Sequence, residues 1–138
     1  MKLLSYVTLF FLFLSTSVYA ADYNYISPAK MKENLEAKSD ILIVDIQVEQ
    51  EFKQHHIPGS MATHAYPVKS DVDKAKLDQA VAEYNSTGTP IVIVCPRGAG
   101  GAKRCYDYLK KHNVPEEKLA ILEKGISGWP YSDLTAGE

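Results

Sequence analysis

The residues best suited to chemistry in this sequence are a cysteine and the glycine-rich stretch that follows it. Pro96 and Arg97 come directly after Cys95, and residues 98–101 then contain three glycines in four positions. A loop of this composition lets backbone N–H groups turn toward one point, where they bind an anion. A helix that begins behind the loop adds its positive end at the same point. We therefore expect the loop to favour the thiolate of Cys95, the nucleophilic form of a cysteine.

The candidate site consists of this cysteine and the loop around it. We predict Cys95 as the catalytic residue, and the predicted substrate-binding residues are Pro96, Arg97, Gly98, Ala99, Gly100 and Gly101. The simpler alternative is a buried cysteine behind an ordinary strand-to-helix turn, but such a turn needs one glycine rather than three. Cys105 lies ten residues further on, in a predicted helix. We predict that Cys105 is inert packing and not a disulfide partner, because a chain of this size can fold without disulfides.

Two apolar runs indicate how the fold positions the cysteine. Residues 91–94 are all β-branched and lead directly into Cys95, which places it at the carboxyl end of a buried strand. Open α/β sheets bind their ligands at that end. Strands are expected at 23–26, 41–44, 61–65, 91–94 and 119–122, and helices from Pro28 and at 48–55, 71–84 and 102–111. Alternating strands and helices predict an α/β fold with a central parallel sheet.

Two other classes of site share parts of this loop. Gly98 and Gly100 follow a strand as in a dinucleotide-binding loop, but Lys103 stands where the third glycine of that fingerprint belongs. A cysteine phosphatase or arsenate reductase needs an arginine that closes the loop on a tetrahedral dianion, and Gly101 stands at that position. Both alternatives therefore fit the loop less well than a site in which the sulfur of Cys95 is the reacting atom.

The sequence resembles the rhodanese family over nearly all of residues 21–138. The family's first motif is matched by Leu42–Asp45, by Glu51-Phe52 and by His56–Ser60. Its cysteine loop is matched by Cys95 and Gly98, and its closing motif by Gly125 and Trp129. The resemblance implies a rhodanese-like sheet of about five parallel strands flanked by helices. It also implies a sulfurtransferase in which Cys95 takes sulfane sulfur as a persulfide from a donor such as thiosulfate or polysulfide. The sulfur then passes to cyanide or a thiol, with no cofactor.

Two positions depart from the family pattern. Gly100 stands where many members have a loop arginine, and Gln47 stands where an arginine follows the first-motif aspartate. Arg97 is the candidate replacement for holding the sulfonate of thiosulfate. The departures leave a second function open, in which the protein carries sulfur or selenium on Cys95 and delivers it to an exported partner protein.

The first twenty residues have the pattern of a secretory signal peptide. Lys2 precedes an apolar run at 3–14, and Val18-Tyr19-Ala20 provides the small residues of a cleavage site. We expect cleavage after Ala20, a rhodanese-like domain at 21–138 and a periplasmic location. Loss of Lys2 leaves 14 of the 15 basic residues against all 17 acidic ones. No basic stripe is present, which argues against nucleic-acid binding, and the oligomeric state stays open.

Two groups of polar residues outside the loop could also form sites. His55, His56 and His64 suggest a metal site, but the sequence offers no obvious fourth ligand, and we predict no bound metal. Asp45 and Glu51 are predicted to stabilise the fold through hydrogen bonds rather than to act as acid–base catalysts.

Overall fold

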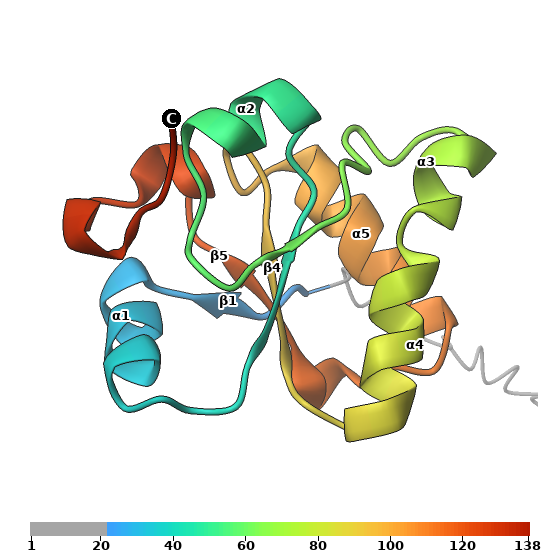
Figure 1. The fold of residues 1–138 in the computed structure, drawn as a ribbon. Helices are drawn as coiled ribbons and strands as arrows, with labels where there is room; N and C mark the ends of the chain where they lie inside the picture. The colour runs from blue at the N-terminus through green and yellow to red at the C-terminus, as the bar shows by residue number, and fades with distance from the viewer. Residues whose placement is uncertain (1–21) are drawn as a thin grey trace, which may run out of the picture.

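The structure is a computed structural model that describes residues 22–138, which fold around one β-sheet (Figure 1). Within these residues five parallel strands pair in the order β1-β5-β4-β2-β3. The strands are β1 (Tyr25–Ile26), β2 (Leu42–Asp45), β3 (Met61–Ala62), β4 (Ile91–Val94) and β5 (Leu119–Leu122). The expected α/β fold with a five-stranded parallel sheet is confirmed. The expected signal peptide, residues 1–20, lies outside the described residues.

Helices cover both faces of the sheet (Figure 1). The helices are α1 (Pro28–Glu36), α2 (Glu49–Gln54), α3 (Asp71–Ala75), α4 (Asp78–Thr87) and α5 (Gly100–Lys111), with short 3₁₀ turns η1 (Glu116–Lys118), η2 (Ile126–Gly128) and η3 (Ser132–Leu134). α1 and the C-terminal turns lie on one side, and α4 and α5 lie on the other. α1 begins as predicted, with the Ser27 side chain accepting a hydrogen bond of 3.1 Å from the N–H of Lys30.

The strand before the cysteine, β4, is buried on both faces. Ile91 and Ile93 pack into the cluster under α4 and α5, whereas Val92 and Val94 pack into the cluster that contains Met31 of α1. Successive side chains of a strand point to opposite faces, so a strand between two helical layers needs apolar residues at every position. This requirement explains why a continuous apolar run predicted β4 correctly.

Residues 71–84, predicted as one helix, belong to two helices. α3 begins with a capping box, in which the side chains of Ser70 and Asp73 each bind the backbone N–H of the other residue. α4 begins at Asp78 and ends at Thr87, and the following Gly88 closes the helix with a φ of 65°. Val72 lies within the predicted helix, but it is 71 % exposed and does not belong to a buried face. Two short helices can turn their apolar faces independently, which a single helix cannot do.

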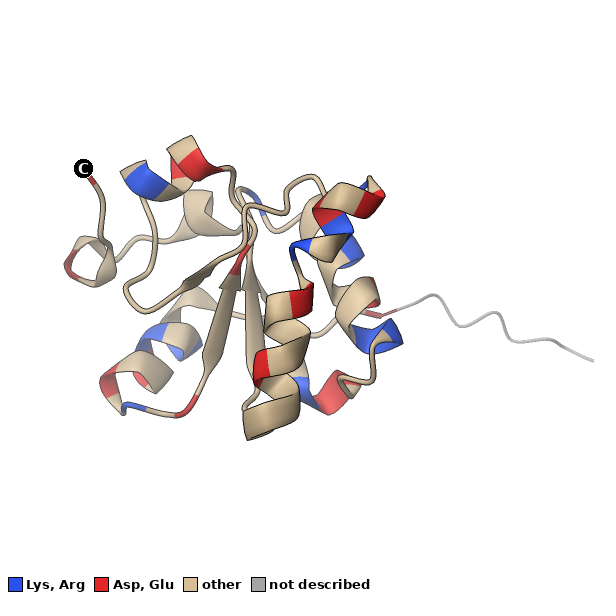
Figure 2. Cartoon of the chain, turned by 45° about the vertical axis from the view of Figure 1, so that its right-hand side comes forward, with Lys and Arg blue, Asp and Glu red and all other residues tan. Residues whose placement is uncertain are grey.

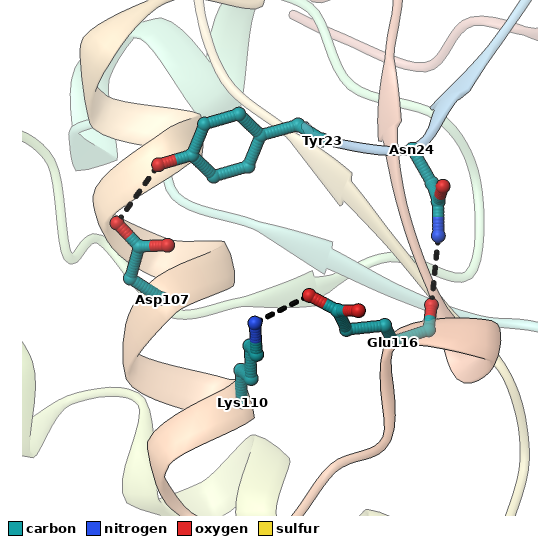
Figure 3. A network of polar contacts seen from close by, with 5 residues as sticks. All are labelled: Tyr23, Asn24, Asp107, Lys110 and Glu116. Atoms are coloured by element: carbon teal, nitrogen blue, oxygen red, sulfur yellow. Dashed lines mark hydrogen bonds and ion pairs between the residues drawn. The ribbon is translucent and has the colours of Figure 1, made fainter. Parts of the chain in front are cut away.

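Side chains anchor the edge strand β1 to its neighbours (Figure 3). The Tyr23 hydroxyl donates to the carboxylate of Asp107 on α5 at 3.0 Å, and the Asn24 side-chain amide donates to the carbonyl of Glu116 at 2.9 Å. Lys110 of α5 forms an ion pair with the carboxylate of Glu116. Among the described residues, side-chain hydrogen bonds to the rest of the domain therefore begin at Tyr23.

Charged residues of both signs are spread over helices on each side of the sheet (Figure 2). This mixed pattern agrees with the small net charge of the sequence, −2. In the part of the chain that the structure describes, none of the helices is long and apolar enough to cross a membrane.

Candidate active site

Cys95 directly follows β4, the middle strand of the sheet. Its side chain is 2 % exposed, and its Sγ accepts a hydrogen bond of 2.8 Å from the backbone N–H of Gly98. A negatively charged sulfur gains more from such a donor than a neutral thiol does. The structure therefore places Cys95 where the sequence predicted it, with a backbone N–H directed at its sulfur. Its role as the catalytic residue stays a prediction.

Two glycines let the cysteine loop and the segment after β5 approach each other closely. Gly98 and Gly125 have φ angles of 69° and 59°, in the left-handed region. A Cβ atom on Gly98 would lie 2.8 Å from the backbone nitrogen of Lys124, and a Cβ on Gly125 would lie 2.1 Å from the carbonyl oxygen of Cys95. Gly125 is thus required because no side-chain atom fits beneath the loop.

Hydrogen bonds join the same two segments. The N–H of Ile126 donates to the carbonyl of Cys95 at 2.9 Å, and the N–H of Ser127 donates to the carbonyl of Pro96 at 3.0 Å. These bonds fix the backbone on which Sγ is carried. The first part of the closing motif, Gly125 and the two residues after it, therefore supports the cysteine loop directly.

The helix behind the loop, α5, begins at Gly100, two residues before the predicted start at Ala102. Gly101 is buried in the first turn, where a Cβ atom would lie 2.9 Å from the ring of Tyr66 and 3.3 Å from Ile46. An arginine at this position would collide with the aromatic ring. The packing thus gives a physical reason why the loop lacks the closing arginine of a phosphatase.

A pocket of about 300 Å³ contains Cys95. Its lining includes Cys95 and five of the predicted binding residues, Pro96, Arg97, Ala99, Gly100 and Gly101. The remaining predicted residue, Gly98, contacts the sulfur through its N–H. The other lining residues are Val48, Glu51 and Tyr66, which the sequence analysis did not assign to the site. The structure therefore brings the predicted loop together with three side chains from elsewhere in the chain.

Among the basic residues close to the loop in sequence, Arg97 is the one that lines the pocket. The Arg104 Nε donates to the carbonyl of Pro67 at 2.9 Å, and the Lys103 Nζ lies 5.5 Å from the centre of the Tyr23 ring. The Lys103 side chain thus has its contact away from Cys95. The Arg104 guanidinium lies beside Gly100, where a Cβ atom would be 2.9 Å from its Nη1, but Arg104 does not line the pocket. Arg97 remains the candidate for holding an anionic donor.

Asp45 is fully buried at the end of β2, as expected for a residue that stabilises the fold. One carboxylate oxygen accepts from the backbone N–H of Gln47 at 2.8 Å, and the other accepts from the Gln47 side-chain amide at 2.9 Å. Burial raises the pKa of Asp45 to about 6, although these hydrogen bonds and the nearby His56 and His64 lower it. Gln47 thus supplies neutral donors to the carboxylate, and Asp45 forms no ion pair within residues 22–138.

Glu51 does not have the role that the sequence predicted. It lies on α2 with an exposed side chain at the Cys95 pocket, and none of the side-chain hydrogen bonds among residues 22–138 involves its carboxylate. Glu49, two residues earlier on α2, instead forms an ion pair of 2.8 Å with Lys53. Glu51 therefore adds an exposed carboxylate to the pocket lining rather than a hydrogen bond to the fold.

Cys105 lies in the second turn of α5 and is fully buried. Burial raises the pKa of the Cys105 thiol far above its usual range, and the nearby Cys95 adds to the rise. A thiol held in this protonated form is a poor nucleophile. The structure agrees with the prediction that Cys105 packs in the core.

The three histidines considered as metal ligands bind backbone carbonyl groups. The Nδ1 of His56 lies 2.7 Å from the carbonyl oxygen of Phe52, and the Nδ1 of His64 lies 3.0 Å from that of Gln47. His55 Nδ1 contacts the carbonyl of its neighbour Gln54. These contacts give each imidazole a role in local structure.

The site residues that sequence reasoning missed come from loops far from Cys95. Val48 precedes α2 and is 39 % exposed, and Tyr66 follows β3 and is 41 % exposed. Tyr66 reaches the pocket because its ring packs against Gly101. The available signal was indirect: parallel strands end at the same edge, so residues after β2 and β3 lie near those after β4.

The fold and the site together define a class of protein. In this class a cysteine lies on a glycine-rich loop at the carboxyl end of the middle strand of a parallel α/β sheet. The family follows from comparison. The chain belongs to the family of the Rhodanese-like domain, whose model matches residues 27–131.

One curated relative is the adenylyltransferase and sulfurtransferase MOCS3 of Drosophila grimshawi, which is 28 % identical over 88 residues. This match covers 64 % of the present chain but only 18 % of the relative.

Solved structures share the fold at low sequence identity. The thiosulfate sulfurtransferase of Pseudomonas aeruginosa is 17 % identical with a TM-score of 0.59, over 83 % of this chain and 20 % of that one. Yeast Ygr203w, described as a protein tyrosine phosphatase of the rhodanese family, is 14 % identical with a TM-score of 0.60, over 86 % and 94 % of the two chains. These likenesses support the fold and leave the reaction to be argued from the site.

Proposed function

We propose that this protein is a sulfurtransferase that carries sulfane sulfur as a persulfide on Cys95. The donor is a compound such as thiosulfate or polysulfide, and the acceptor is cyanide or a thiol. The observation that carries the proposal is the hydrogen bond of 2.8 Å from the Gly98 N–H to the Cys95 Sγ within a pocket. Membership of the Rhodanese-like domain family and the match to a sulfurtransferase support it.

The proposed reaction has two displacement steps. The Cys95 thiolate attacks the outer sulfur of thiosulfate, an S–S bond forms, and the S–S bond of the donor breaks to release sulfite. The acceptor nucleophile then attacks the outer sulfur of the persulfide, and the bonding electron pair returns to Cys95 as a thiolate. The Gly98 N–H contacts the sulfur that is negatively charged at the beginning and at the end of this cycle.

Intact mass spectrometry of the purified protein tests the proposal. After incubation with thiosulfate or polysulfide, we expect a gain of one sulfur atom that cyanide removes. Cys95→Ser should abolish this gain, whereas Cys105→Ser should retain most of it because Cys105 is buried away from the pocket. Equal losses in the two variants would contradict a mechanism with one working cysteine.

A second candidate function is that of a sulfur or selenium carrier for an exported partner protein. It is favoured by the glycine at position 100, which leaves Arg97 as the loop cation at the pocket. Steady-state turnover of thiosulfate and cyanide separates the two functions. An enzyme turns over repeatedly with these small molecules, whereas a carrier loads once and discharges slowly until its partner is added.

We also propose that the protein is exported to the periplasm after cleavage of residues 1–20, on the basis of the apolar run and the small residues before Ala21.

A further inference from the structure

The pocket around Cys95 has one acidic and one basic side chain in its lining. Glu51 is contributed by α2, and Arg97 by the loop after β4. Both side chains are exposed, and both also line an adjoining pocket of about 240 Å³, so they lie between the two cavities. Neither forms an ion pair within residues 22–138. Two opposite charges are therefore available to a molecule that approaches the sulfur.

The remaining walls of the pocket limit what can bind. Val48 and Tyr66 add apolar surface to the lining. A volume of about 300 Å³ is at the small end of ligand-binding cavities, so a small molecule is favoured. A dianion such as thiosulfate gains from Arg97 but is repelled by Glu51. A zwitterion with one ammonium and one carboxylate group gains from both side chains.

We propose that this pocket selects acceptor thiols of the α-amino-acid type, with Glu51 binding the ammonium group and Arg97 binding the carboxylate. The inference rests on the proposed sulfurtransferase function and names the acceptor class of the same site. Glu51 and Arg97 are then specificity-determining residues that position the acceptor sulfur toward Cys95.

The transfer step balances without any further reactant. The acceptor thiolate attacks the outer sulfur of the protonated Cys95 persulfide and forms a new S–S bond. The bond between the two persulfide sulfurs breaks, its electron pair goes to the Cys95 Sγ, and the proton stays on the transferred sulfur. One thiolate is consumed and one is formed, and the Gly98 N–H is placed to stabilise the thiolate that forms.

Four thiol acceptors of graded charge test the inference: L-cysteine, cysteamine, 3-mercaptopropionate and 2-mercaptoethanol. The protein is loaded with polysulfide, freed of donor, checked by intact mass, and then discharged in single-turnover experiments. Rates are compared per thiolate, because the four thiols ionise differently. We expect L-cysteine to react about five- to tenfold faster than either singly charged acceptor, the effect of one contact with a charged group near the surface.

Variants identify which side chain acts on which charge. Glu51→Gln should slow L-cysteine and cysteamine by about five- to tenfold and leave the other two acceptors unchanged. Arg97→Gln should slow L-cysteine and 3-mercaptopropionate only. Glu49→Gln is the matched control, because Glu49 lies on the same helix but pairs with Lys53 and does not line the pocket. It should leave all four rates unchanged.

Two failures are distinguishable. A protein that loads normally but discharges to all four acceptors at the same rate per thiolate overturns the acceptor class alone, as does a Glu51→Gln variant that behaves like Glu49→Gln. A protein that shows no cyanide-removable sulfur on Cys95 overturns the proposed function, and the acceptor class with it.

Discussion

Arg97 is the residue on which the choice of sulfur donor depends. Thiosulfate carries a sulfonate that must be held while its outer sulfur is attacked, and Arg97 is the cation of the loop that lines the Cys95 pocket. We predict that Arg97→Ala slows loading from thiosulfate by about tenfold, the low end of the effect of a contact between charged groups, because the side chain is exposed. Loading from polysulfide should change much less, because polysulfide has no sulfonate.

Single-turnover loading rates with the two donors measure this difference. Lys103→Ala is the control, because Lys103 lies on the neighbouring helix with its ammonium group near the Tyr23 ring. Equal slowing of both donors by Arg97→Ala would show that Arg97 shapes the loop rather than binding the donor.

At the scale of elements, the segment after β5 supports the cysteine loop through a glycine. A Cβ on Gly125 would lie 2.1 Å from the Cys95 carbonyl oxygen, whereas a Cβ on Gly88 would have no atom within 4 Å. Both glycines have positive φ angles, 59° and 65°. We predict that Gly88→Ala lowers the free energy of unfolding by about 1 kcal/mol through backbone strain alone. Gly125→Ala should lower it by about 3 kcal/mol or more and also reduce sulfur loading.

Urea unfolding and sulfur loading, measured on both variants, distinguish backbone strain at a positive φ from a steric clash with the Cys95 loop. If Gly125→Ala is no less stable than Gly88→Ala and loads sulfur normally, the loop does not need the close approach seen in the structure.

The elements differ in how far the sequence determines them. The run from Ile91 to Val94 is short and entirely β-branched, which favours a strand buried on both faces, so the position of Cys95 followed from local pattern. The break at Lys76 and Leu77 could not be predicted in this way, because the apolar residues of α3 and α4 all lie close to the spacing of one continuous helix. That break depends on which face of each helix packs against the sheet, a tertiary property.

The candidate site shows the same division. Its loop is contiguous and was predicted from composition, whereas Val48 and Tyr66 reach it only through the order of the strands. Glu51 was recognised as part of a motif, but its role was wrong because spacing along the chain does not show which side of α2 faces solvent. Side chains brought together by topology need the structure.

For the whole molecule, the residue at which the folded domain begins limits where a signal peptide can be cleaved without loss of contacts. Side-chain contacts hold the edge strand from Tyr23 onward, at Asp107 and Glu116 (Figure 3). We predict that the exported protein begins at Ala21, so that cleavage leaves these contacts intact. N-terminal sequencing of the protein from the cell envelope checks this prediction, and an intact Met1 would contradict it.

The stability of the whole fold should depend on the protonation of Asp45. Burial raises its pKa from 3.8 to about 6, so the folded state binds more protons than the unfolded state between these pH values. The contribution of Asp45 is fully present below about pH 4 and is lost as the pH rises through about 6. Asp45→Asn removes this titration and keeps the shape of the side chain. We therefore predict that the variant gains about 3 kcal/mol relative to the wild type between pH 4 and pH 7.

Urea unfolding at a series of pH values measures this difference, and Asp73→Asn provides a control of opposite sign. Hydrogen bonds from the backbone N–H groups of Lys69 and Ser70 lower the pKa of Asp73, so its contribution is present above its ordinary pKa and is lost as the pH falls. Substitution of Asp73 should therefore cause a loss of stability that diminishes as the pH is lowered. A constant difference between Asp45→Asn and the wild type across pH 4 to 7 would mean that Gln47 stabilises the ionised carboxylate as well as water does.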